Sequence, residues 1–330
     1  MSDLLADLRA SGLVAPGEVA RVAPLTGGVS SDISLVTTAA GRFCVKRALA
    51  KLKVAADWRA PVARNKSEVD WMKTVARIAP HAVPEILADH SDHGWFAMDY
   101  LDPDRHPLWK VELSEGRIDP TFAAAVGATL AKIHAVSAAD ATLARQFSTD
   151  YIFIPIRLDP YLAATAVKHP DCAARFNTLI AQTLANKNAL VHGDVSPKNI
   201  LIGPQGPVFL DAECAWWGDP AFDLAFCLNH LLLKCVWRPQ WSAGYLESFD
   251  ALAASYLAGV NWESRGAIET RAAGLLPGLN LARIDGKSPV EYITEDADKE
   301  KVRQIARRFL LDPVASLSVI RVDWAKEMDT

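Results

Sequence analysis

The residue pattern changes near Asp102-Pro103, and this change constrains the fold more than any other feature of the sequence. Before it, short apolar runs separated by glycine-rich turns are typical of β-strands, as in "LTGGVSSDISLVTTAAGRFCVKRA". After it, apolar residues recur at helical spacing, as in residues 120–140. The sequence therefore predicts an α+β protein. Residues 1–102 should form a small antiparallel β-sheet lobe with one helix, and residues 103–330 a larger, mainly helical lobe.

Three segments of the first part have a clear local pattern. Residues 63–80 have the spacing of the one long helix of this lobe, and residues 3–10 predict a short amphipathic helix ahead of the first strand. The apolar residues of the longer helix share one face: Val69, Met72, Val75 and Ala76. Side chains alternate in direction along "RFCVKR", so Cys44 and Lys46 should lie on one face of a strand.

Composition excludes several classes of function. The chain has 330 residues and 50% hydrophobic content, which is enough for a sizeable core. A net charge of -4 and a pI near 6.1 argue against nucleic acid and anionic membranes as partners. The five cysteines show no C-x-x-C spacing, and the acidic N-terminus does not resemble a signal peptide. We therefore expect a soluble cytoplasmic protein, with monomer and homodimer both open.

The segment 191–213, "VHGDVSPKNILIGPQGPVFLDAE", holds the most informative polar residues. Two short apolar strands joined by a Pro/Gly turn predict an antiparallel β-hairpin. The expected register pairs Leu201 with Phe209, Ile200 with Leu210 and Asn199 with Asp211. An amide oxygen and a carboxylate would then meet at the open end of the hairpin, and both suit Mg²⁺. Asp194 lies on the loop before the hairpin, where it could accept a proton from a substrate hydroxyl.

Three motifs in this order, "HGDVSPKNIL", "VFLDAE" and "GDPAFDLA", resemble the signatures of the aminoglycoside phosphotransferase-like kinases, relatives of choline kinase and of the protein kinases. The resemblance extends from about Leu25 to about Leu231. It implies a protein-kinase-like bilobal fold with a catalytic β-hairpin in the larger lobe, and transfer of the γ-phosphoryl of ATP to a hydroxyl. By this resemblance Asp194 is the catalytic base, and Asn199 and Asp211 hold Mg²⁺.

The same resemblance implies supporting roles for nearby residues. Asp223 would hydrogen-bond the backbone of the catalytic loop, although an acid at a helix start also suits the helix dipole. His192 would orient this loop, with a role as general base as the second interpretation. Lys198 stands where many relatives have a small residue, and either reaches the γ-phosphate or faces solvent.

The nucleotide phosphates would contact a glycine-rich turn, "TGGVSS", whose candidate residues are Gly27, Gly28, Ser30 and Ser31. A plain hairpin turn would explain the same glycines. Lys46 on the next strand would pair with the α- and β-phosphates. An ion pair with Glu68, twenty-two residues later on the following helix, would fix Lys46, although such residues are often only solvated.

By resemblance, "FAMDYLD" is the connector whose backbone hydrogen-bonds adenine. Met98 would lie behind the base, and Asp99, Tyr100 and Leu101 along its edge. Cys44 would face the purine. Core packing explains Met98 and Cys44 equally well.

The acceptor is expected to be a small molecule with a hydroxyl group. Only seven residues separate Asp211 from Asp219, too few for a segment that binds an extended polypeptide. The acceptor pocket would be built after residue 103 and would include residues 274–293. Acids and bases alternate in residues 263–291, so the sequence does not favour a polycationic acceptor.

Two helices are expected near the end of the chain. "SPVEYI" has the features of a capping box and predicts a short helix from Ser288. Residues 296–312 place their apolar side chains on a single helical face.

Two other functions are compatible with the same motifs. One is a nucleotide-binding regulator, a pseudokinase, with the same fold but no transfer reaction. The other is a metal-dependent phosphohydrolase, which needs no acceptor. Because Asp and Asn are common turn residues, one such position carries little weight. The four residues Asp194, Asn199, Asp211 and Asp223 in the expected order favour the kinase.

Overall fold

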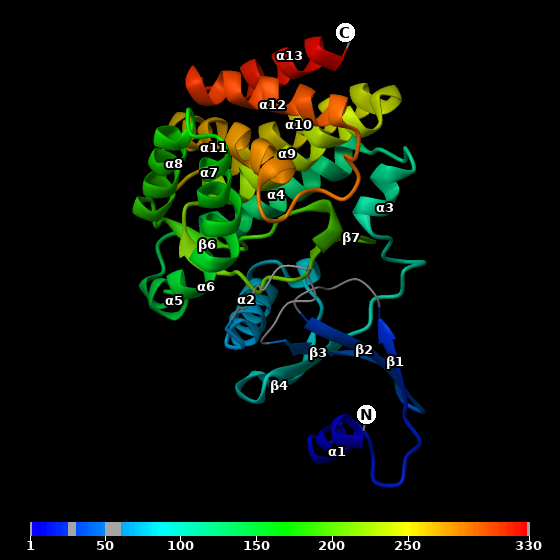
Figure 1. Cartoon of the computed structure of the whole chain (residues 1–330). Coiled ribbons are helices and arrows are strands. Elements are labelled where there is room, and N and C mark those ends of the chain that lie inside the picture. The colour runs from blue at the N-terminus through cyan, green and yellow to red at the C-terminus, as the bar shows by residue number, and fades with distance from the viewer. Residues whose placement is uncertain (1, 26–30, 50–60, 329–330) are drawn as a thin grey trace.

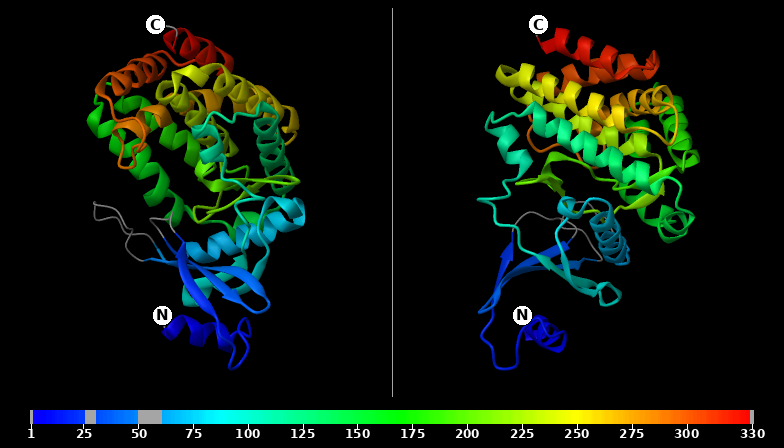
Figure 2. Two further views of the ribbon diagram at one scale, coloured as in Figure 1. Left: turned by 90° about the vertical axis from the view of Figure 1, so that its right-hand side faces the viewer. Right: turned by 180° about the vertical axis from the view of Figure 1, so that it is seen from behind.

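The expected combination of a small sheet and a large helical part is present. A computed structural model of the chain describes residues 2–25, 31–49 and 61–328. The sheet lies at one end of the molecule and the helices fill the other (Figure 1). The helix α2 (Arg64–Ile78) lies between the two parts, and both views in Figure 2 show it there.

The small part is built on a five-stranded antiparallel sheet in the order β1-β2-β3-β5-β4. Its strands are β1 (Arg21–Leu25), β2 (Ser31–Thr38), β3 (Gly41–Ala48), β4 (Ile86–His90) and β5 (Trp95–Asp99). Short 3₁₀ turns at Pro80–Ala82 and Ser91–His93 flank β4. The predicted hairpin of β2 and β3 is confirmed, with Thr38 opposite Gly41 at its turn.

The two faces of the sheet pack against different helices, as the alternation in "RFCVKR" predicted. Phe43 and Val45 join a cluster with Leu8 of α1 (Ser2–Ala10) on the outer face. Cys44, on the opposite face, belongs to the main core together with Met72 of α2. Lys46 shares the inner face with Cys44, so the strand directs a buried cation toward the helical part.

Helices dominate the rest of the chain. Their bounds are α3 (Trp109–Ser114), α4 (Pro120–Ser137), α5 (Ala141–Gln146), α6 (Asp150–Phe153), α7 (Ala164–Lys168), α8 (Ala173–Ala185), α9 (Pro220–Trp237), α10 (Ser242–Gly259), α11 (Arg265–Asp285), α12 (Asp296–Leu311) and α13 (Leu317–Met328). A π-helical segment, Ile154–Ala163, joins α6 to α7. The helix predicted within residues 120–140 is present as α4, and it buries its apolar face: Phe122, Val126, Leu130 and Ile133.

Two short strand pairs lie where the helical part faces the sheet. β6 (Ala189–Val191) pairs with β9 (Trp216–Gly218), and β7 (Ile200–Gly203) pairs with β8 (Gly206–Phe209). The segment between β6 and β7 contains a 3₁₀ turn, Pro197–Asn199. The β7–β8 pair is the hairpin expected from the sequence.

The register of this hairpin differs by one residue from the prediction. Ile200 pairs with Phe209, and Gly203 with Gly206, so the turn contains two residues instead of three. Gly206 has a φ of 126°, a conformation that only glycine adopts easily, and it closes the tighter turn. Asn199 consequently faces Leu210, whose N–H it accepts at 2.9 Å, and not Asp211.

The short helix expected from Ser288 is absent. Ser288 uses its hydroxyl and its carbonyl oxygen to accept hydrogen bonds from Arg283, so the hydroxyl is not available as a helix cap. The predicted helix over residues 296–312 is present as α12, and α13 follows it. Among the described helices, none has the length and apolarity needed to cross a membrane.

Candidate active site

The loop after β6 is held by Asp223, at the start of α9. Its two carboxylate oxygens accept the backbone N–H groups of His192, at 2.7 Å, and Gly193, at 2.8 Å. Gly193 has a φ of 80°, and a Cβ there would lie 2.8 Å from the carbonyl oxygen of Cys214. The loop therefore needs glycine at this position, and Asp223 makes the contact expected of it.

His192 is fully buried, and both of its ring nitrogens are occupied. Nδ1 accepts the N–H of Asp194 at 3.1 Å, and Nε2 donates to the carbonyl of Leu210 at 3.1 Å. Burial lowers the pKa of His192 in spite of the nearby carboxylates Asp223 and Asp194. A neutral ring that links the loop to the strand after β8 fits the orienting role, and not the role of a base.

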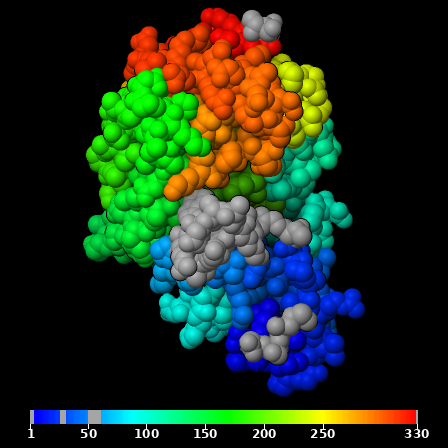
Figure 3. Space-filling view, viewed as in Figure 1, coloured from blue at the N-terminus to red at the C-terminus, as the bar shows by residue number. Residues whose placement is uncertain are grey.

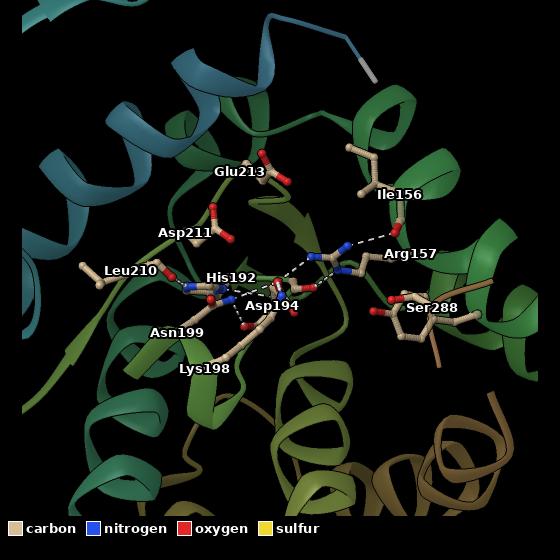
Figure 4. Close-up of polar contacts among 12 residues, drawn as sticks. Ile156, Arg157, His192, Asp194, Lys198, Asn199, Leu210, Asp211, Glu213 and Ser288 are labelled. Atoms are coloured by element: carbon tan, nitrogen blue, oxygen red, sulfur yellow. Dashed lines mark hydrogen bonds and ion pairs between the residues drawn. The ribbon is translucent and has the colours of Figure 1, made fainter. Parts of the chain in front are cut away.

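Asp194 lies at the centre of a cluster of donors (Figure 4). Its Oδ2 contacts Nη2 of Arg157 at 2.9 Å, Nζ of Lys198 at 3.1 Å and Nδ2 of Asn199 at 2.9 Å. Its Oδ1 has no hydrogen-bond partner among the described residues. Burial would raise the pKa of Asp194, but the charges of Arg157 and Lys198 hold it below its ordinary value. The group is therefore a carboxylate with one unused oxygen.

Arg157 was not predicted from the sequence. It lies in the π-helical segment, where Nε donates to the carbonyl of Gly193 at 2.5 Å and Nη1 to that of Ile156 at 2.9 Å. π-Helical turns often occur at functional sites, but the prolines in this segment hide any helical periodicity. A buried arginine thus fixes both the backbone of the loop and its carboxylate.

Asp211 follows β8 and has an unusual backbone conformation. Its φ of 66° is the only positive value for a non-glycine residue in the described part of the chain. Its Oδ1 contacts Nζ of Lys46 at 2.5 Å. Burial raises the pKa of Asp211, but Lys46 and Lys198 lower it well below its ordinary value. Such local strain is typical of functional sites.

Asn199 and Asp211 each lie near Asp194: Asn199 hydrogen-bonds it, and Asp211 is close enough to raise its pKa. Figure 4 draws the three side chains together. The amide of Asn199 donates to the backbone oxygen and to Oδ2 of Asp194, so its amide oxygen points elsewhere and is free to bind a cation. No ready-made group of three His, Cys, Asp or Glu ligands occurs among the described residues. The pair nevertheless fits Mg²⁺, which takes few protein ligands beside water and phosphate oxygens.

Lys46 forms the expected ion pair with Glu68. Its Nζ lies 2.7 Å from Oε2 of Glu68, and both side chains are buried. Burial opposes the charge of Lys46, but Asp211 and Glu68 raise its pKa above the ordinary value. Burial also raises the pKa of Glu68, to about 7. The pair joins β3 to α2 and directs a cation at Asp211.

A second buried pair, also missed from the sequence, joins the small part to the site. Nε of Arg64, in the first turn of α2, lies 2.9 Å from Oε2 of Glu213. Glu213 follows Asp211 by two residues. The residues around Arg64 in the sequence do not indicate whether its side chain is paired or solvated. Its partner Glu213 lies almost 150 residues later in the chain, so the ion pair could not be predicted from local spacing.

The other candidate nucleotide residues have mixed surroundings. Met98 lies opposite Cys44 in the sheet, and both are nearly buried. Burial and Asp99 raise the pKa of the Cys44 thiol to about 11. Tyr100 follows β5 and stacks under Arg42, 4.7 Å from the ring centre. Ser31, at the start of β2, has a buried hydroxyl without a partner among the described residues. Gly27, Gly28 and Ser30 lie outside the described residues.

A large cavity lies near the connector and is separate from the site. It has a volume of about 740 Å³ and is lined by Asp99 and Leu101 of the connector, with residues of α2 and of the β7–β8 turn. Lys46, Asp194 and Asp211 do not line it. The chemical groups therefore lie elsewhere, between β3 and the loop after β6.

Comparison with known proteins identifies the family of the chain. The sequence matches the phosphotransferase enzyme family over residues 21–264. Methylthioribose kinase from Yersinia pseudotuberculosis is 25% identical over 231 residues, which covers 62% of this chain and 56% of that protein. The chain thus spans about half the length of the curated relatives it matches.

Two solved structures share the fold. A choline/ethanolamine kinase family protein from Mesorhizobium loti has a TM-score of 0.53 at 16% identity, with 98% of this chain and 99% of that one covered. An amicoumacin kinase in complex with AMP-PNP, Ca²⁺ and Ami has a TM-score of 0.57 at 11% identity, with 96% and 95% covered. These likenesses confirm the protein-kinase-like fold expected from the sequence. Since the family match extends over most of the residues, the chain belongs to the phosphotransferase enzyme family.

Proposed function

We propose that this protein is an ATP- and Mg²⁺-dependent phosphotransferase that transfers the γ-phosphoryl group of ATP to a hydroxyl of a small molecule. The observation that carries the proposal is Asp194, a buried carboxylate with a lowered pKa and one oxygen without a partner among the described residues. A carboxylate held in this way can position an alcohol and accept its proton.

Access to Asp194 depends on Lys198. Asp194 is only 2% exposed, whereas the side chain of Lys198 is half exposed and contacts Oδ2 from the solvent side. Movement of this flexible side chain would admit the acceptor hydroxyl without disturbing Arg157 or Asn199. After transfer, the proton of the hydroxyl would remain on Asp194 until the product leaves.

The nucleotide would lie between residues 1–102 and 103–330. Lys46, fixed by Glu68, would pair with the α- and β-phosphates, and the connector from Met98 to Leu101 would hold adenine. Asn199 and Asp211 would hold Mg²⁺, which when bound neutralises charge on the phosphoryl oxygens. Because Lys46 already contacts Asp211, phosphate and metal together would separate this ion pair. The amicoumacin kinase, which shares the fold, binds AMP-PNP and Ca²⁺.

A small acceptor is supported by the path of the chain after Asp211. Residues 212–215 lead directly into β9, which pairs with β6. No long segment intervenes that could bind an extended peptide. The similar proteins are a methylthioribose kinase, a choline/ethanolamine kinase family protein and an amicoumacin kinase. These names point to different acceptors, so similarity does not identify the acceptor of this chain.

The test is ADP release by the purified chain with ATP, Mg²⁺ and a panel of sugars, amino alcohols, amino acids, hydroxy acids and antibiotics. The proposal predicts release that depends on one class of acceptor. If ATP raises the melting temperature but no acceptor leads to release of ADP, a pseudokinase would be favoured. Rapid phosphate release without an acceptor would favour a phosphohydrolase.

A further inference from the structure

A second pocket lies beside Asp194, in the helical part of the molecule. Its walls come from α3, α9, the end of α11 and the loop that carries Lys198. Figure 3 shows this face hollowed below the segment that follows α11 (orange), next to α3 (teal). The pocket is small, with a volume of about 30 Å³. Lys198 lines it and also contacts Asp194, so this one side chain touches both the pocket and the candidate base.

Lys234 of α9 is a buried cation in this pocket that forms no ion pair with any described residue. Its side chain is 1% exposed, and its Nζ has no hydrogen-bond partner among the described residues. Nζ lies 5.1 Å from the ring centre of Trp237 and 4.9 Å from that of Tyr292. Aromatic faces attract a cation but accept none of its three N–H groups in the usual way. Burial of an unpaired ammonium costs free energy, so a ligand with hydrogen-bond acceptor atoms would bind favourably here.

Arg283 of α11 adds a second cation whose described partners are neutral. Its Nη1 donates to the hydroxyl of Tyr161, at 3.2 Å, and to Ser288, while its Nε is buried without a partner among the described residues. The ring of Tyr161 lies 5.6 Å from the Arg283 guanidinium and 5.9 Å from that of Arg157. Positive groups therefore extend from this pocket to the arginine that holds Asp194.

The pocket as a whole is strongly positive. Four cations line it: Lys110, Lys198, Lys234 and Arg283. Glu291, the one carboxylate among the described lining residues, is paired with Lys110 and acts on Lys234 only at longer range, where it raises the pKa of Lys234. His230 also lines the pocket, and its pKa is lowered by burial and by the four cations together. The ring is therefore neutral, and the lowered pKa reflects how close the cations lie to it.

From this arrangement, and resting on the proposed function, we propose that the pocket binds an anionic group of the acceptor, so that the substrate is an alcohol carrying a carboxylate or a phosphate. Lys234 and Arg283 would hold the anion while the hydroxyl reaches Asp194. The same lysines and the arginine would repel a cationic acceptor. The pocket therefore disfavours polyamine antibiotics and quaternary amines as substrates.

The first arm of the test measures anion binding without turnover. Isothermal titration with acetate and with inorganic phosphate compares the wild type with Lys234→Met and Lys234→Gln. Lys132→Met, an exposed lysine on α4, is the control. We expect both Lys234 variants to weaken binding of one of the anions by about 10-fold or more, and Lys132→Met to leave it unchanged. Equal binding by the wild type and both folded Lys234 variants would overturn the inference.

The second arm measures ADP release with matched acceptors: D-glucose, D-gluconate, D-glucose 6-phosphate, lactate, lactamide and choline. The inference predicts that the wild type prefers gluconate or glucose 6-phosphate to glucose, and lactate to lactamide, and that Lys234→Met loses this preference. Whether a carboxylate or a phosphate is preferred identifies the anionic group. Preference for neutral or cationic acceptors would overturn the inference but leave the proposed function intact. If no acceptor of any class supports ADP release, the proposed function fails, and the binding arm alone decides on the anion site.

Discussion

Arg157 and Asp194 form a buried ion pair in which Nη2 lies 2.9 Å from Oδ2, although the two residues are 37 positions apart in the sequence. The same guanidinium holds the carbonyl of Gly193. The arginine thus determines both the position and the charge of the carboxylate that we propose as the base.

Replacing Arg157 should change the pH dependence of the reaction. Arg157 is the strongest of the charges that lower the pKa of Asp194, so Arg157→Met should raise this pKa. Asp194 would then be ionised only at higher pH, and the acid limb of kcat/KM should move upward. The measurement is the pH profile of ADP release. Arg157→Lys, which keeps the charge, should move the limb less. An unchanged limb in both variants would show that Arg157 does not tune Asp194.

Replacing Lys234 should stabilise the fold, in a way that depends on pH. Burial lowers the pKa of Lys234 from 10.5 to about 8, with Lys110 the next contributor. Because the unfolded chain binds this proton more tightly, Lys234 destabilises the fold below about pH 8, and the penalty fades as pH rises toward 10.5. At pH 7, Lys234→Met should therefore raise the free energy of unfolding by up to ~3 kcal/mol.

Urea unfolding at pH 7 and at pH 10 tests this expectation, with Lys132→Met as the matched control. The gain from Lys234→Met should be smaller at pH 10 than at pH 7. A loss of stability at pH 7 would mean that the ammonium has a counterion in solution.

Replacing Glu68 should weaken nucleotide binding. Glu68→Gln keeps the shape of the side chain but removes the charge that fixes Lys46. A hydrogen bond between charged groups contributes about 1.5–3 kcal/mol, so the Kd for ATP should rise about 10- to 100-fold. Glu85→Gln, an exposed position before β4, serves as the control and should bind ATP normally. If Glu68→Gln bound ATP with normal affinity, the ion pair between Lys46 and Glu68 would not contribute to nucleotide binding.

Gly193 and Gly266 should respond oppositely to alanine. Gly193 has a φ of 80° and no room for a Cβ, whereas Gly266, in the first turn of α11, has open space around it. Gly193→Ala should lower the free energy of unfolding by about 1–3 kcal/mol and reduce activity, because the loop before Asp194 must shift. Gly266→Ala should raise it by about 0.4–1 kcal/mol. Urea unfolding of both variants is the measurement, and equal effects would contradict the loop geometry.

Features that depend on local periodicity were predictable from the sequence. The alternation in "RFCVKR" separated Cys44 and Lys46 from Phe43 and Val45, because a strand between two cores has two distinct faces. The order of the motifs around Asp194 likewise located the loop that we propose as the centre of the active site.

Features that depend on distant contacts or on one turn were not predictable. The hairpin register required knowing whether the turn at Pro204 holds two or three residues, and both are compatible with the sequence. The residues around Ser288 predicted a helix cap, but the Ser288 hydroxyl accepts a hydrogen bond from Arg283 instead. Arg157 reaches Asp194 from a π-helical segment without a periodic pattern. In each case a tertiary hydrogen bond or turn geometry outweighed the local preference.

The most direct test of the account compares ADP release by the wild type and by Asp194→Asn at saturating ATP and acceptor. The asparagine keeps the size of the side chain but cannot accept the proton of the hydroxyl, so kcat should fall by about 100-fold or more. The ATP-induced rise in melting temperature should remain, and Asp92→Asn, at an exposed position, should behave as the wild type does. An Asp194→Asn variant that turns over at the wild-type rate would contradict the proposed mechanism.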